Sequence, residues 1–133
     1  MSERHVPTFW IRIIAISNLI CSGVCLTEIL RPTPNPLFGV ITNGVAIFIY
    51  QALSTVVMVY TGRGLYRLNE TARRVAIAFA VVSEFQYLLW WFLGPAPLSR
   101  FTGFRVGILF FGTALWLFFI WYLHTRRGFF SRL

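Results

Sequence analysis

Four long apolar stretches run along the chain, separated by short segments rich in Pro, Gly or Arg. They cover residues 9–30, 38–60, 75–93 and 104–124. Each is close to the roughly 20 mostly apolar residues that an α-helix needs to cross the hydrocarbon core of a bilayer. The pattern predicts a single transmembrane domain, residues 1–133, folded as an all-α antiparallel four-helix bundle.

The segments between the stretches predict where the helices end. Three prolines follow the first stretch in Arg31-Pro32-Thr33-Pro34-Asn35-Pro36, and Gly94-Pro95-Ala96-Pro97 follows the third. Proline removes a backbone donor and clashes with the preceding helical turn. We expect Gly62-Arg63-Gly64 to end the second helix and Asn69 to cap a helix that begins at Glu70.

The basic residues predict the orientation in the membrane. All twelve are Arg, and nine of them lie in the N-terminal segment, the middle loop or the C-terminal tail. The two other loops hold only Arg31, Arg100 and Arg105. Loops rich in Arg and Lys stay on the cytoplasmic side of the membrane. This asymmetry predicts that both termini are cytoplasmic.

Composition supports the membrane prediction and narrows the partners. The chain is 57% hydrophobic and 12% charged, with a formal charge of +8. Soluble domains carry roughly 25% charged residues. Because the arginines lie mostly at the ends of apolar stretches, we expect membrane lipids as partners and no nucleic acid. The arginines expected to contact lipid head groups are Arg63, Arg67, Arg73, Arg74, Arg126 and Arg127.

Polar residues at mid-span are the strongest functional candidates. The predicted midplane cluster is Asn18, Gln51, Glu84 and Thr113. An acid at the bilayer centre costs about 2.5–3.5 kcal/mol on insertion scales. Glu84 is therefore expected either to be neutral and hydrogen-bonded to Gln51 or Asn18, or to contact water or a partner. In the first case it ties helices together, and in the second it has a function.

Other residues are expected to have structural roles. Glu28, Arg31 and Arg105 form the predicted outer ion pair. The small residues Gly103, Gly107, Ala76 and Ala80 are expected at helix–helix contacts, where they let helices approach closely. Cys21 and Cys25 lie within one apolar stretch and are expected to be reduced packing residues.

No motif for enzymatic chemistry occurs in the chain. It has no G-x-S-x-G, H-E-x-x-H or Walker sequence, and only four acidic residues. We expect a protein that is not an enzyme and that has no metal site and no cofactor. A haem held by His5 and His124, or contact with a pigment, is the alternative.

The segment from Gly62 to Arg74, with the sequence GRGLYRLNETARR, resembles a segment of small uncharacterised bacterial four-helix integral membrane proteins. Those proteins carry G-x-G-L-x-R-L followed by an A-R pair between their second and third spans. The opening from Trp10 to Ile14 is also similar to theirs. The resemblance implies the four-helix fold and the bacterial cytoplasmic (inner) membrane, and it implies no activity.

The small size and the wide apolar surface predict a non-catalytic accessory or scaffold subunit of a larger membrane complex. Its partners would then be membrane lipids and other transmembrane subunits. The alternative is a small oligomeric transporter or channel that uses the midplane residue Glu84.

Overall fold

A computed structural model describes residues 6–30, 37–38, 40–41, 43–93 and 103–130. Its helices are α1 (Val6–Leu30), α2 (Gly44–Tyr66), α3 (Glu70–Leu93), α4 (Gly103–Thr125) and the short 3₁₀ helix η2 (Arg127–Phe129). All four α-helices are long and apolar enough to cross a membrane. The chain is therefore an all-α, multi-pass membrane protein with four spanning helices.

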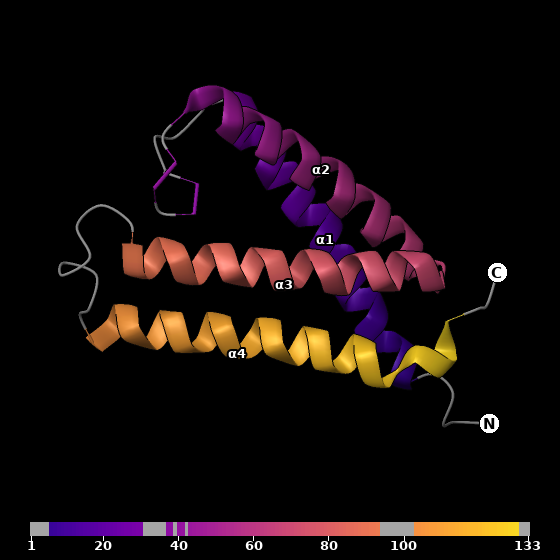
Figure 1. Ribbon diagram of the computed structural model, residues 1–133. Helices are drawn as coiled ribbons and strands as arrows, with labels where there is room; N and C mark the ends of the chain where they lie inside the picture. The colour runs from indigo at the N-terminus through magenta and orange to yellow at the C-terminus, as the bar shows by residue number, and fades with distance from the viewer. Residues whose placement is uncertain (1–5, 31–36, 39, 42, 94–102, 131–133) are drawn as a thin grey trace.

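The four helices form two antiparallel hairpins that meet at one end (Figure 1). Helix α1 packs along α2, and α3 packs along α4. The hairpins meet where α1 begins, where α2 turns into α3 and where α4 ends, and they diverge toward the other end. We call the meeting point, residues 6–15, 61–76 and 119–130, the Arg-rich end, and the opposite end the far end.

The hydrophobic core lies at the Arg-rich end, where side chains from both hairpins pack together. Its buried members are Ile11, Ile14, Ala15, Leu65, Ala76, Tyr122, Leu123 and Phe130. They come from all four helices and from the residue that follows η2. All four helices are therefore packed together at this end.

Helices α1 and α2 approach closely at Gly62. A Cβ atom there would lie 2.7 Å from Leu19 Cγ and 2.9 Å from the backbone oxygen of Ala15. Next to this contact, Asn18 Nδ2 donates a hydrogen bond to Thr61 Oγ1 over 3.1 Å. Only a glycine lets the two backbones come this near, and the nearby hydrogen bond satisfies the polar side chains within the bilayer.

The turn between α2 and α3 covers only residues 67–69. The backbone N–H of Asn69 donates to the oxygen of Gly64 at 2.8 Å, and that of Leu68 to the oxygen of Leu65 at 3.0 Å. Leu68 has a φ of 56°, so the chain leaves α2 through the left-handed residue typical of this helix ending. Asn69 Oδ1 then accepts from the N–H of Ala72, which confirms Asn69 as the N-cap of α3.

Helix α2 is displaced along the sequence from its predicted range of 38–60. Asn43 caps its start by accepting from Val45 N at 2.9 Å. Before the cap, Leu37 and Ile41 pair through two backbone hydrogen bonds of 2.8 and 2.9 Å. The helix also continues through residues 62–64, which the sequence had suggested as its end. A glycine inside a helix costs only about 1 kcal/mol and does not by itself end it, and Gly62 lies where α2 packs against α1.

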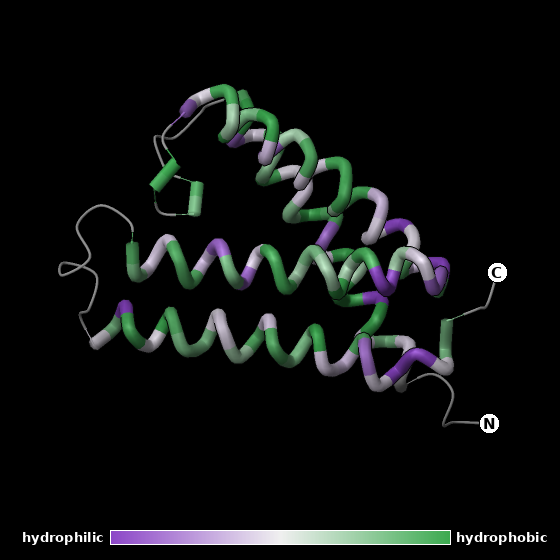
Figure 2. Tube along the Cα trace, viewed as in Figure 1, coloured by the Kyte–Doolittle hydropathy of each residue, from purple (hydrophilic) through white to green (hydrophobic). Residues whose placement is uncertain are grey.

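Most residues along the helices are apolar (Figure 2). Hydrophilic residues gather where the α2–α3 turn and the end of α4 lie, and apolar residues dominate the length between the two ends. Large exposed hydrophobic side chains occur on all four helices. In a soluble protein this surface would promote aggregation, whereas in a membrane it is covered by lipid.

Candidate functional site

A buried arginine links α3 to α4 at the Arg-rich end. The side chain of Arg73 is held by Glu70 in two hydrogen bonds of 2.6 Å, from Nε to Oε2 and from Nη2 to Oε1. Its Nη1 donates to the backbone oxygen of Leu123 at 3.0 Å. The residue is 6% exposed. Two parallel bonds to one carboxylate fix the guanidinium in position and orientation.

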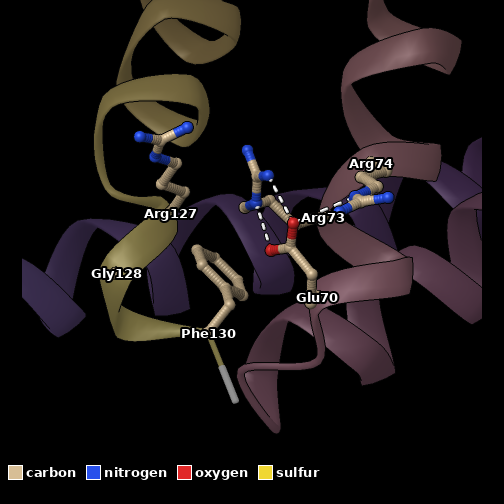
Figure 3. Close-up of a pocket in the computed structure, with 6 residues that line it drawn as sticks. All are labelled: Glu70, Arg73, Arg74, Arg127, Gly128 and Phe130. Carbon is tan, nitrogen blue, oxygen red and sulfur yellow. Dashed lines mark hydrogen bonds and ion pairs between the residues drawn. The ribbon is translucent and has the colours of Figure 1, made fainter. Parts of the chain in front are cut away.

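The Arg73 guanidinium lines a cavity of about 550 Å³ between α3 and the end of α4 (Figure 3). The other lining residues are Glu70, Arg74, Arg127, Gly128 and Phe130. The Phe130 ring centroid lies 5.7 Å from Arg73 Cζ. Arg74 Nε donates to Glu70 Oε1 at 3.0 Å. Arg127 has no hydrogen-bond or ion-pair partner for its guanidinium among the residues that the structure describes.

Five of the six arginines expected to contact lipid head groups have exposed side chains. These are Arg63, Arg67, Arg74, Arg126 and Arg127. Arg73 requires a correction, because its side chain is buried against Glu70 and the end of α4. The spacing of Glu70 to Arg73 and Arg74, three and four residues, was the signal in the sequence that could have indicated this pair.

Glu84 on α3 is a buried acid within the bundle. It is 7% exposed, and neither carboxyl oxygen has a partner among the described residues. Thr113 Oγ1 on α4 is buried and likewise has no partner there. A buried polar group that makes no hydrogen bond is costly and calls for an explanation. Contacts within the described chain therefore do not explain why an acid occupies this position.

The predicted midplane cluster is not a single cluster. Asn18 donates to Thr61, and neither Asn18 nor Gln51 is hydrogen-bonded to Glu84. The antiparallel pairing of α1 with α2 sets Asn18 opposite Thr61. Gln51 is ten residues earlier on α2, about 15 Å along the helix at 1.5 Å per residue. A mid-span position in two different stretches of the sequence therefore did not place these residues in contact.

A second cavity of about 420 Å³ opens between the diverging hairpins. Its polar lining includes Glu28, Tyr50, Gln51, Gln86 and Tyr87. Its aromatic lining includes Trp90 and Trp116. The Oε1 atom of Gln86 is buried and has no hydrogen-bond partner among the described residues. This cleft brings together two residues that the sequence had assigned to different groups, Glu28 of the outer ion pair and Gln51 of the midplane cluster.

Of the four small residues expected at helix–helix contacts, the two alanines are buried and the two glycines are exposed. Ala76 and Ala80 are buried, each 5% exposed, as helix-packing residues should be. Gly103 and Gly107 are exposed, and a Cβ atom at either would meet nothing within 4 Å. Their expected role in packing within this chain is therefore corrected, because α3 crosses α4 on another face.

The remaining candidates are only partly covered by the structure. Arg31 and His5 lie outside the described residues, whereas Arg105 and His124 are exposed. Cys21 and Cys25 are free thiols, and Cys25 Sγ lies 3.9 Å from Met58 Sδ. Among the residues described, no group of three or more His, Cys, Asp or Glu could hold a metal ion.

Comparison with known proteins does not assign the chain to a family, so only its class can be stated. No family model, no curated protein and no solved structure matches this chain. The fold and the sites define a multi-pass, all-α membrane protein with an arginine-lined cavity at one end and a cleft of mixed polar and apolar lining between the hairpins.

Proposed function

We propose that this chain is a non-catalytic accessory or scaffold subunit of a larger complex in a bacterial cytoplasmic membrane. The observation that carries the proposal is the apolar outer face of α4. Its residues Phe104, Phe110 and Phe111 are 81%, 71% and 71% exposed. Broad aromatic surface of this kind is typical of helix faces that pack against lipid or against another membrane subunit.

The shape of the bundle supports the same proposal. The two hairpins pack together at the Arg-rich end and diverge away from it, and most residues along each helix are not buried within this chain. A scaffold subunit needs helix faces to offer to its neighbours, and these faces run the length of α4.

Purification in mild detergent tests the proposal. An affinity-tagged chain should retain larger transmembrane subunits in stoichiometric amounts. The double variant Phe110→Ala/Phe111→Ala should lose them, whereas Leu53→Ala/Val56→Ala, which truncates exposed side chains on α2, should keep them. Recovery of the chain alone, or as a homodimer, would contradict the proposal.

A second candidate is a small oligomeric transporter or channel that uses Glu84. Two observations favour it: the carboxyl group is buried without a partner in the described chain, and a cleft lined partly by polar side chains opens between the hairpins. Ionisable residues inside a bilayer often mark the paths of ions and protons. In proteoliposomes, Glu84→Gln should then abolish flux while the protein still inserts and assembles. Unchanged flux in this variant would exclude this use of Glu84.

A further inference from the structure

The cavity at the Arg-rich end carries an excess of positive charge. Three guanidinium groups, from Arg73, Arg74 and Arg127, face one carboxylate, from Glu70. Glu70 pairs with Arg73 and with Arg74. Arg127 is left without an ion-pair partner among the described residues. The lining of the cavity therefore has two positive charges more than the carboxylate neutralises.

The central charge of this lining is held in place and is largely removed from water. Arg73 cannot swing outward without breaking its bonds to Glu70 and to the Leu123 carbonyl. Phe130 covers one face of its guanidinium. Fixed charges in a partly desolvated site attract a counter-ion more strongly than flexible charges in water do.

The side chains around the cavity suit one kind of anion. Guanidinium groups bind phosphate oxygens through paired, charge-assisted hydrogen bonds. Figure 3 shows the side chains of Arg127 and Arg74 on opposite sides of Arg73, with Glu70 below it. A volume of about 550 Å³ leaves ample space for a phosphate group and its substituent.

We propose that this cavity binds one phosphate group, carried by the head group of an anionic phospholipid or supplied as free phosphate. Arg127 provides a positive charge that has no ion-pair partner among the described residues, and Arg73 provides a fixed charge in the lining of the cavity. This goes beyond general contact between arginines and the membrane surface, because it assigns a single, stoichiometric site. It also does not depend on the proposed role in a complex.

Arg127 and Arg63 offer a matched pair of variants. Both arginines are exposed and lie at the same end of the bundle, but Arg63 does not line this cavity. Arg127→Gln and Arg63→Gln therefore remove the same charge from different places. Arg127 makes no side-chain hydrogen bond or ion pair among the described residues, so its loss should leave the fold intact, which circular dichroism would verify.

The experiment measures anion binding to delipidated protein in neutral detergent. Inorganic phosphate is titrated against chloride at constant ionic strength, and phosphatidylglycerol is titrated against phosphatidylcholine in mixed micelles, with thermal unfolding as the readout. The unmodified protein should be stabilised by one or both of the anionic probes. Arg127→Gln should weaken this binding about tenfold, and Arg63→Gln should change it less than about twofold.

The two titrations distinguish the sources of the phosphate. Stabilisation by both probes supports a site for the phosphate group itself, and stabilisation by phosphatidylglycerol alone supports a lipid site. No preference for either probe over its reference would overturn the proposal. Equal weakening in Arg127→Gln and Arg63→Gln would also overturn it, because binding would then follow net charge alone.

Discussion

Arg73 on α3 donates a hydrogen bond to the backbone oxygen of Leu123, in the last turn of α4, across 3.0 Å. The last carbonyl groups of a helix have no partner within the helix, and a positive charge near them is favourable. Arg73 thus caps α4 from a neighbouring helix, while Glu70 holds the same guanidinium from its own helix.

Replacement of Arg73 should destabilise the protein strongly. Arg73→Gln leaves the Leu123 carbonyl and the Glu70 carboxylate without their strongest donor. We expect a loss of about 3 kcal/mol in the free energy of unfolding, the range found when one partner of a buried pair is removed. Unfolding by titration with a denaturing detergent would measure it.

Arg74→Gln is the matched control for this variant. Arg74 pairs with the same carboxylate, but its side chain is 75% exposed. Exposed ion pairs contribute at most about 1 kcal/mol. Equal effects of the two substitutions would show that burial of Arg73 contributes nothing.

The glycines should differ in their tolerance of a methyl group. In Gly62→Ala the new Cβ would meet the Ala15 backbone oxygen and the Leu19 side chain, so α1 must move away. We expect a destabilisation of about 1–3 kcal/mol, typical of overpacking. Gly107→Ala meets nothing within 4 Å and should stabilise the helix by up to about 1 kcal/mol. The same detergent titration applies, and a neutral Gly62→Ala would argue against the close approach of α1 and α2.

The hydrogen bond between Asn18 and Thr61 should be measurable as a coupling energy. A double-mutant cycle of Asn18→Ala and Thr61→Val isolates the bond from the other effects of each substitution. Interhelical hydrogen bonds in membrane proteins average about 0.6 kcal/mol, and we expect a value of that size. Additive effects of the two substitutions would mean that the helices do not meet at these residues.

Glu84→Leu should stabilise the isolated chain. The carboxyl group is buried and makes no hydrogen bond within the described chain, so its removal breaks none there. An apolar side chain of similar volume avoids the desolvation penalty, and we expect a gain of about 1–3 kcal/mol. One of the two alternatives left open by the sequence gave Glu84 a polar partner, Gln51 or Asn18, and with such a partner the same substitution would be destabilising.

Glu84→Gln is the control for this experiment, since it keeps the size and polarity of the side chain. Its stability should stay within about 1 kcal/mol of the unmodified protein, because it neither adds nor removes a buried polar group. Destabilisation of the isolated chain by Glu84→Leu would contradict the prediction, because it would mean that the Glu84 carboxyl group makes a stabilising hydrogen bond.

The orientation of the chain is open to chemical labelling. Single cysteines at Ser2 and Ser99, introduced after replacement of Cys21 and Cys25 by Ala, report on the two sides of the membrane. The arginine asymmetry predicts that a membrane-impermeant thiol reagent added outside the cell labels Ser99→Cys and not Ser2→Cys. Labelling of Ser2→Cys from outside would reverse the assigned orientation.

The spans could be predicted because the signals for them are local. The stretch 104–124 corresponds closely to Gly103–Thr125, and Asn69 was identified as a cap from its own neighbourhood. The end of α2 was misplaced because Gly62 appears as a turn residue in sequence. Its real role depends on Ala15 and Leu19, which lie more than 40 residues away in the chain.

The sites were less predictable, because their contacts join distant parts of the chain. The proximity of Glu70 and Arg73 follows from helical spacing, but nothing near Arg73 in the sequence indicates the Leu123 carbonyl. Glu84 is buried in the bundle. Its polar neighbours depend on the register between helices, and a pattern of residues within one span does not contain that register.

The turn between α2 and α3 also limits how the two helices can be placed in a membrane. Three residues reach at most about 10 Å, a third of the ~30 Å hydrocarbon core. The end of α2 and the start of α3 must therefore lie at the same face of the bilayer. A movement that carries one of these two ends into the hydrocarbon must carry the other with it, so the helices change depth together at this end.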